Sequence, residues 1–304
     1  MAELLQHLFD ALSLGSLYAL AALGIALIFG VMRLVNFAYG DVISFCAFAL
    51  IVPTTEAVSR MMLGALPAPL LIVSALAVGA GLSIALEWLV FRRLRHANPA
   101  TTMVAAFAVG FVILNVLMAL HSSRPKSVDL WSPLNTPLNV LGARVPALQL
   151  VTIGIAGVLL VGLVWMLRRT RVGLEMRAAA EDFSMARMLG VRANRVILLA
   201  FGLSGALAAI VGLLMLTKTG VADIRMGGPM MLIAFVATVI GGLGSLGGAV
   251  LAGFLMGFIS TLLQALLPME ARPFRDAFVY LAVIALLVVR PAGLFVTSAS
   301  TQRV

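Results

Sequence analysis

Long runs of apolar residues recur along the whole of this 304-residue sequence. A helix needs about 20 mostly apolar residues to cross a bilayer, and candidate spans lie near 8–31, 34–52, 66–90, 100–120, 147–167, 196–216, 229–244, 247–267 and 277–290. Apolar residues make up 62% of the chain and charged residues 11%, which is more apolar surface than a soluble domain of this length can bury. Helices satisfy their own backbone groups in lipid, and the short alternating segments of a membrane β-barrel are not evident. The sequence therefore predicts an all-α, polytopic integral membrane protein with about eight to ten transmembrane helices in a single domain, 1–304.

Two of these spans are interrupted. The range 229–267 contains a glycine-rich stretch at 241–248, which predicts a turn between two short helices. The range 34–52 opens with the polar string Asn36-Phe37-Ala38-Tyr39-Gly40-Asp41. In one interpretation Asn36 is the N-cap of a helix and Asp41 lies in its first turn, where the helix dipole favours an anion. In the other, a broken or re-entrant helix exposes its backbone and Asn36 to a passing zwitterion.

Basic residues set the expected orientation. Three arginines cluster within 92–95 and seven within 168–195, and the positive-inside rule places both loops in the cytoplasm. The loop 121–146 then lies outside, and alternation places 53–65, 217–228, 268–276 and the N-terminus outside and the C-terminus inside. The surplus of 21 basic over 12 acidic residues fits cytoplasmic loops rather than nucleic-acid binding.

Motifs of catalysis are missing from the sequence. A P-loop needs a lysine after its second conserved glycine, and neither Lys126 nor Lys218 is in that position. The HExxH pattern of zinc proteases, the GxSxG nucleophile elbow and redox-cofactor ligands are absent as well. The single cysteine, Cys46, lies in an apolar run and is expected to be a packed side chain. We therefore expect a non-catalytic protein that binds no ATP, metal or cofactor of its own.

The segment 168–195 contains the pattern of an amphipathic helix over 174–189. Apolar residues share one face, acidic and basic residues share the other, and Gly190 is placed to end the helix. The apolar face consists of Met176, Ala179, Ala180, Phe183 and Ala186. Such a helix either lies on anionic lipid or docks into the groove of a cytoplasmic partner, and the pattern alone does not decide between them.

Small residues form two further patterns. Gly244 with Gly248, and Gly253 with Gly257, are GxxxG pairs, and Gly202, Gly205 and Gly212 form a stripe. Small residues allow helices to approach closely in lipid. They predict either helix packing within this chain, or a contact with a second membrane subunit or a moving gate.

Several segments resemble those of ABC-importer permeases. An alanine-rich stretch with an acidic residue precedes a glycine, as Glu181 precedes Gly190, and the whole chain is similar to branched-chain amino acid permeases of the LivH type. The matching stretches are 15–24, 27–41, 173–182, 237–248 and 290–295. Where the family motif usually reads NFAHGE, this chain has Tyr39 and Asp41 in place of histidine and glutamate.

The resemblance implies a permease subunit that translocates leucine, isoleucine or valine across a bacterial inner membrane. Its partners would be a second permease subunit, two ATP-binding-cassette ATPase subunits, a periplasmic substrate-binding protein and membrane lipid. The resemblance also implies that Asn36, Tyr39 and Asp41 border the substrate path and that the cytoplasmic helix couples to the ATPases. The coupling residues would be Met176, Ala180, Glu181, Phe183 and Gly190. An importer of urea, short amides or another amino acid is the alternative within this class, and a self-contained secondary transporter is the alternative outside it.

Overall fold

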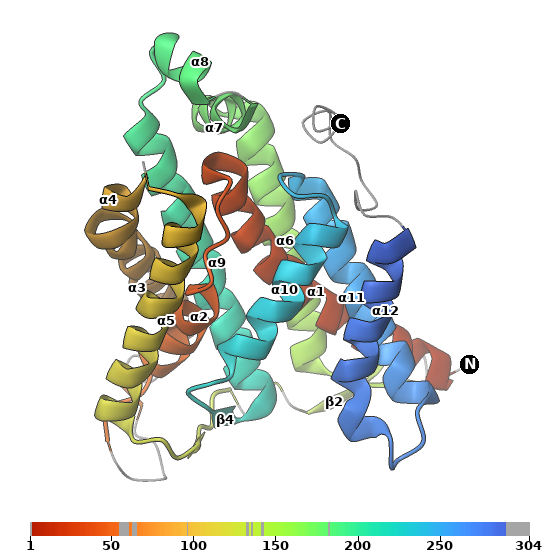
Figure 1. The fold of residues 1–304 in the computed structure, drawn as a ribbon. Helices are drawn as coiled ribbons and strands as arrows, with labels where there is room; N and C mark the ends of the chain where they lie inside the picture. Colours follow the sequence, from red (N-terminus) through yellow and green to blue (C-terminus); the bar gives the residue numbers. More distant parts are fainter. Residues whose placement is uncertain are drawn as a thin grey trace. The chain divides into compact units, whose positions relative to one another are not determined.

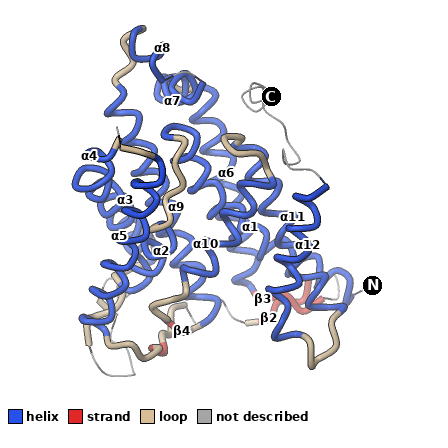
Figure 2. The backbone as a smooth tube through the Cα atoms, viewed as in Figure 1, coloured by secondary structure: helices blue, strands red, loops and turns tan. Residues whose placement is uncertain are grey.

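The described chain is almost entirely helical (Figure 1). The computed structural model describes residues 2–54, 61–62, 66–95, 97–131, 134, 136–140, 143–181 and 183–289. In chain order the helices are α1 (Ala2–Met32), α2 (Tyr39–Phe48), α3 (Ala68–Leu86), a π-helical turn (Glu87–Phe91), α4 (Arg92–Leu94), α5 (Pro99–His121), α6 (Ala147–Arg169), α7 (Arg171–Glu181), α8 (Phe183–Met188), α9 (Ala193–Thr219), α10 (Gly227–Ile240), α11 (Leu246–Leu266), a 3₁₀ turn (Arg272–Phe274) and α12 (Arg275–Val289). Short antiparallel pairs join β1 (Lys126–Ser127) to β4 (Val221–Ala222) and β2 (Pro137–Val140) to β3 (Ala143–Pro146) (Figure 2).

Each predicted span coincides with a helix, but the helices differ in length. α1, α3 with its π-helical extension, α5, α6, α9 and α11 are long and apolar enough to cross a membrane. α2 and α10 have 10 and 14 residues, which is about 15–21 Å against a hydrocarbon core of about 30 Å. α12 is described as far as Val289, where the described residues end. The predicted all-α, multi-pass architecture is confirmed, and six spans reach full length within the described residues.

The helices divide into two compact units. The first unit comprises 1–26, 131–166 and 233–304, and in it α11 packs on α1 through glycines. A Cβ atom on Gly257 would collide with the backbone of Gly15 and lie 3.0 Å from the carbonyl oxygen of Ala11. A Cβ atom on Gly253 would lie 2.5 Å from the Cα of Ala19. Gly253 and Gly257 therefore pack helices within the chain, as one of the two interpretations predicted.

A glycine-rich turn connects α10 to α11, as predicted. Gly242 and Gly244 adopt φ angles of 89° and 95°, which side chains disfavour, and Ser245 caps α11 by accepting a 3.1 Å hydrogen bond from the N–H of Gly248. The prediction that Gly244 and Gly248 form a helix-packing pair is wrong. Gly244 belongs to the turn, and Gly248 approaches Gly241, whose carbonyl carbon would lie 2.8 Å from an added Cβ atom.

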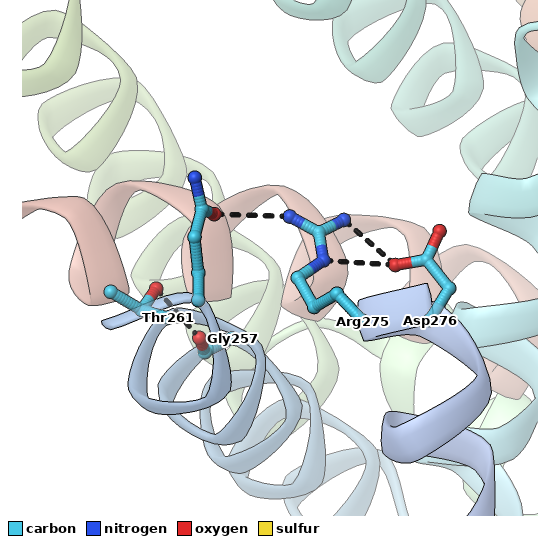
Figure 3. A network of polar contacts seen from close by, with 5 residues as sticks. Gly257, Thr261, Arg275 and Asp276 are labelled. Atoms are coloured by element: carbon cyan, nitrogen blue, oxygen red, sulfur yellow. Dashed lines mark hydrogen bonds and ion pairs between the residues drawn. The ribbon is translucent and has the colours of Figure 1, made fainter. Parts of the chain in front are cut away.

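Polar side chains tie the far end of α11 to the start of α12 (Figure 3). The Arg275 guanidinium donates a hydrogen bond to Gln264 at 3.1 Å and two to Asp276 at 2.8 and 2.9 Å. One turn earlier, the Thr261 hydroxyl donates to the carbonyl of Gly257 at 3.0 Å, which satisfies this hydroxyl inside its own helix. Among these bonds, the one between Arg275 and Gln264 joins α11 to α12.

The second unit comprises 27–130 and 167–232, and α9 is its central helix. α9 crosses α3 where Gly79 and Gly205 face each other, because a Cβ atom on either would collide with the carbonyl oxygen of the other. Further along α9, a Cβ atom on Gly212 would lie 2.7 Å from the carbonyl oxygen of Ile43 in α2. The glycine stripe of α9 is thus used to pack α2 and α3 within the chain.

A buried ion pair closes one end of the α3–α9 contact. Glu87 is fully buried at the start of the π-helical turn and accepts a hydrogen bond from the guanidinium of Arg95. Arg95 also donates to the side-chain oxygen of Asn194 at 2.5 Å. Since Asn194 lies in the first turn of α9, the network joins the end of α3 to the start of α9.

Candidate functional site

A non-helical stretch separates α1 from α2. α1 ends at Met32, Arg33 has a φ angle of 53°, and the chain then runs irregularly into a turn before α2 (Figure 1). The side-chain oxygen of Asn36 accepts a 3.1 Å hydrogen bond from the N–H of Ala38, and its carbonyl accepts one from Tyr39 at 3.2 Å. Asn36 therefore shapes a turn ahead of the helix. The N-cap of α2 is Ala38, so the prediction that Asn36 fills that position is wrong, whereas Asp41 lies in the first turn of α2 as expected. Asn36 is buried, and its exposure to a substrate stays a prediction.

α2 is enclosed by other helices of its unit. Next to its start, a Cβ atom on Gly40 would lie 2.7 Å from the carbonyl oxygen of Gly227, the first residue of α10. The hydroxyl of Ser44 accepts a 3.0 Å hydrogen bond from the N–H of Gly227. The free thiol of Cys46 is buried in the same helix, as its apolar setting predicted. With 10 residues, α2 is a short helix inside the bundle rather than a full span.

Tyr39 and Asp41 differ in their surroundings. Tyr39 is 1% exposed, and its hydroxyl has no hydrogen-bond partner within the part of the chain that the structure describes. A buried hydroxyl without a partner costs roughly 1–3 kcal/mol. Asp41 is half-buried, and its carboxylate oxygen Oδ2 lies directly against Gly110 of α5. One turn away on the same two segments, the rings of Phe37 and Phe107 stack with centroids 4.4 Å apart.

The contact with α5 fixes the depth of Asp41. Gly110 is the central residue of α5, with eleven residues on either side, and α5 is one of the helices long enough to span a membrane. The Asp41 carboxylate therefore lies opposite the middle of a transmembrane helix. Acidic residues at this depth are costly and are found where they serve substrate or ion pathways. The structure brings Asn36, Tyr39 and Asp41 together at the start of one buried helix.

The predicted cytoplasmic helix is described as α7 (Arg171–Glu181) and α8 (Phe183–Met188), on either side of Asp182. It begins three residues earlier than the expected 174. Asp182 lies outside the described residues, as do the side chains of Glu181 and Phe183. Gly190 ends α8 as predicted. Its φ angle is 88°, its N–H donates to the carbonyl of Arg187 at 3.1 Å, and the N–H of Val191 donates to that of Ala186 at 3.0 Å. These two bonds form a Schellman motif.

The described side chains of the predicted docking face are buried or half-buried within the protein. Met176, Ala179 and Ala186 are each 3% exposed, and Ala180 is half-buried. Met176 is thus a packed side chain, and it is not available to a partner in this structure. An amphipathic pattern identifies the apolar side of a helix, but it does not say whether that side packs on its own chain.

Other apolar side chains of this segment are exposed, and sequence reasoning missed them. The exposed fractions are 60% for Met185, 83% for Met188 and 84% for Leu189. Their spacing of i, i+3 and i+4 places them on one side of a helix, and this spacing was the available signal. We call these three residues the apolar tip. A compact exposed apolar group of this kind marks a contact with another protein or a membrane surface.

Known proteins resemble this chain over nearly its whole length. A family described as the permease component of the branched-chain amino acid transport system matches residues 7–288. BraD of Pseudomonas aeruginosa, a high-affinity branched-chain amino acid transport system permease protein, is 30% identical over 300 residues, covering 95% of each chain. LivH of Escherichia coli, with the same description, is 30% identical over 302 residues, covering 95% of this chain and 94% of its own. A probable branched-chain amino acid transport permease of Methanocaldococcus jannaschii is 27% identical over 91% of this chain and 86% of its own.

Proposed function

Because this chain belongs to the family of permease components of branched-chain amino acid transport systems, we propose that it is the membrane-spanning subunit of an ATP-driven importer of leucine, isoleucine and valine. The observation that carries this proposal is the match with permease relatives over 95% of the chain. The protein is a multi-pass membrane protein. A bacterial inner membrane is the proposed location, in keeping with the bacterial relatives.

The energy for transport comes from partner chains in this proposal. The sequence has no P-loop, so two separate ATPase subunits would hydrolyse ATP, and a periplasmic binding protein would deliver the amino acid to a pair of permease subunits. We place 91–99 and 168–195 in the cytoplasm and 121–146 outside, since the arginine clusters favour this orientation.

The apolar tip is the proposed contact with the ATPase subunits. Met185, Met188 and Leu189 are exposed, and the Schellman motif at Gly190 fixes the direction in which α9 leaves α8. α9 in turn touches α2 at Gly212, backbone against backbone. A displacement of α8 would therefore reach α2, and with it the predicted path residues Asn36, Tyr39 and Asp41, through a single packed helix.

Reconstitution into proteoliposomes tests this function. We expect uptake of radiolabelled leucine that requires ATP, the ATPase subunits, the permease pair and the loaded binding protein. The purified chain alone should neither bind nor hydrolyse ATP. ATP-driven uptake of urea or acetamide but not leucine would refute the proposed substrate, and leucine uptake driven by an ion gradient without ATPases would refute the importer class.

A further inference from the structure

The carboxylate of Asp41 faces no counter-charge in the described part of the chain. Within the described residues, its side chain makes no hydrogen bond or ion pair with another residue, and the one backbone N–H it meets is its own. The facing stretch of α5 offers Ala106, Gly110 and Ile113, all buried and none polar. The first turn of a helix stabilises an anion only weakly. A charge held opposite the centre of a transmembrane helix therefore lacks most of the compensation that such a position requires.

Gly110 keeps this carboxylate in place. A Cβ atom added to Gly110 would collide with Oδ2 of Asp41 and lie 3.3 Å from its Cγ and 3.5 Å from the Cα of Ala38. The neighbouring Phe37–Phe107 stack holds the two segments together on one side of this contact. Any side chain at position 110 would therefore push the carboxylate away from α5 or push α2 and α5 apart.

We propose that Asp41 binds the ammonium group of the transported amino acid and that Gly110 determines its position by leaving room for the carboxylate. This inference rests on the proposed function, because it names the part of the substrate that the predicted path recognises. An amino acid carries one positive group, and a carboxylate without a partner is the group that pairs with it most strongly. While substrate is bound, the ammonium group would supply the charge compensation that the chain itself does not.

Substrate preference in the complete permease–ATPase complex tests the inference directly. Saturation-transfer NMR on the complex in nanodiscs, without the binding protein, compares leucine with 4-methylpentanoate, which has the same side chain and carboxylate but no ammonium group. We expect the unsubstituted complex to prefer leucine by at least about tenfold, since hydrogen bonds to charged groups contribute that much. Asp41→Asn should abolish the preference, Asp41→Glu should keep it, and Gly110→Ala should weaken it.

Two controls separate recognition from structure. Gly81 lies in α3 with no atom within 4 Å of an added Cβ, so Gly81→Ala should bind both compounds as the unsubstituted complex does. Asp41→Asn should not lower the thermal unfolding temperature, because it removes a charge that has no partner. Retained preference in Asp41→Asn, or loss of the preference together with a lower unfolding temperature, would overturn the inference while leaving the proposed function standing. Failure of the unsubstituted complex to bind leucine without the binding protein would also overturn the inference alone, whereas failure to import leucine with the loaded binding protein would overturn both.

Discussion

Individual glycines decide how closely the helices of this protein approach. Gly253 and Gly257 bring α11 against the backbone of α1, and Gly79 and Gly205 do the same for α3 and α9. In lipid, helices gain little from burying apolar surface, so close backbone contact is a main source of their association. Each of these positions therefore contributes through the absence of a side chain.

Gly257→Ala should destabilise the protein. The added methyl group would meet the backbone of Gly15, which cannot move aside as a flexible side chain can. Overpacking of this kind costs about 1–3 kcal/mol, and we expect a lower thermal unfolding temperature in detergent. Gly247, in the same helix, has no atom within 4 Å of an added Cβ. Gly247→Ala is therefore the matched control, and equal unfolding temperatures for the two variants would contradict the packing argument.

Glu87→Gln should also destabilise the protein, through charge rather than size. Glu87 is fully buried, and the substitution would remove the negative charge that pairs with the guanidinium of Arg95, which is 15% exposed. Breaking a buried pair costs about 3–5 kcal/mol, and the same unfolding measurement detects it. The exposed pair of Arg275 and Asp276 is the control, because Asp276→Asn should cost less than about 1 kcal/mol. A similar loss of stability in both variants would show that burial of the Glu87–Arg95 pair is unimportant.

At the scale of elements, length and hydropathy were sufficient to locate the long helices. α1, α5, α6, α9 and α11 could be predicted because each is a continuous apolar run of membrane-spanning length. The short α2 and α10 were located within candidate spans, but their lengths were not predictable, since their flanking polar and glycine residues do not reveal how deep the chain lies. The Glu87–Arg95 pair was not predictable, because a regular α-helix would not place these two residues in line. The wider π-helical turn that begins at Glu87 changes this alignment and brings the two side chains together.

The candidate site was predicted only in part, because the sequence does not show which residues meet in the folded chain. The polar string at 36–41 stood out against an apolar background, but its partner Gly110 did not, since a glycine in an apolar helix carries no signal of what it faces. Likewise, Gly190 was recognisable from its position after a helix, whereas the exposed side of α8 depends on how α7 and α8 pack. Tertiary contacts, and not local sequence, determine these features.

Substitutions in α7 and α8 should separate docking from packing. Met188→Ser combined with Leu189→Ser removes two side chains exposed by 83% and 84%, and recruitment of the ATPase subunits in a pull-down should fall at least about tenfold. Leu174→Ser, on α7 and 60% exposed, should leave recruitment intact. Met176→Ala should instead reduce stability by about 2–5 kcal/mol, because Met176 is buried. Unchanged recruitment by the double variant would favour the lipid-anchor interpretation of this segment.

At the scale of the whole molecule, the orientation in the membrane remains a prediction that labelling can test. Ser123 is exposed in the loop after α5, and Leu174 is exposed in α7. In a Cys46→Ser background, an impermeant thiol reagent applied to intact cells should label Ser123→Cys and not Leu174→Cys, because only the first is expected outside. Permeabilised cells should allow both to react. The opposite pattern in intact cells would invert the assignment.

The glycine contacts have a consequence for how slowly parts of the protein open. Where Gly79 meets Gly205 and Gly257 meets Gly15, no side chain lies between the two backbones that can change rotamer and let solvent pass. Amide hydrogens near these four residues should therefore exchange with deuterium only when a helix pair separates as a whole, and they should be among the last to exchange. The amides at each crossing would then exchange at a common rate, the rate at which that helix pair opens. A transport cycle would have to leave both crossings closed.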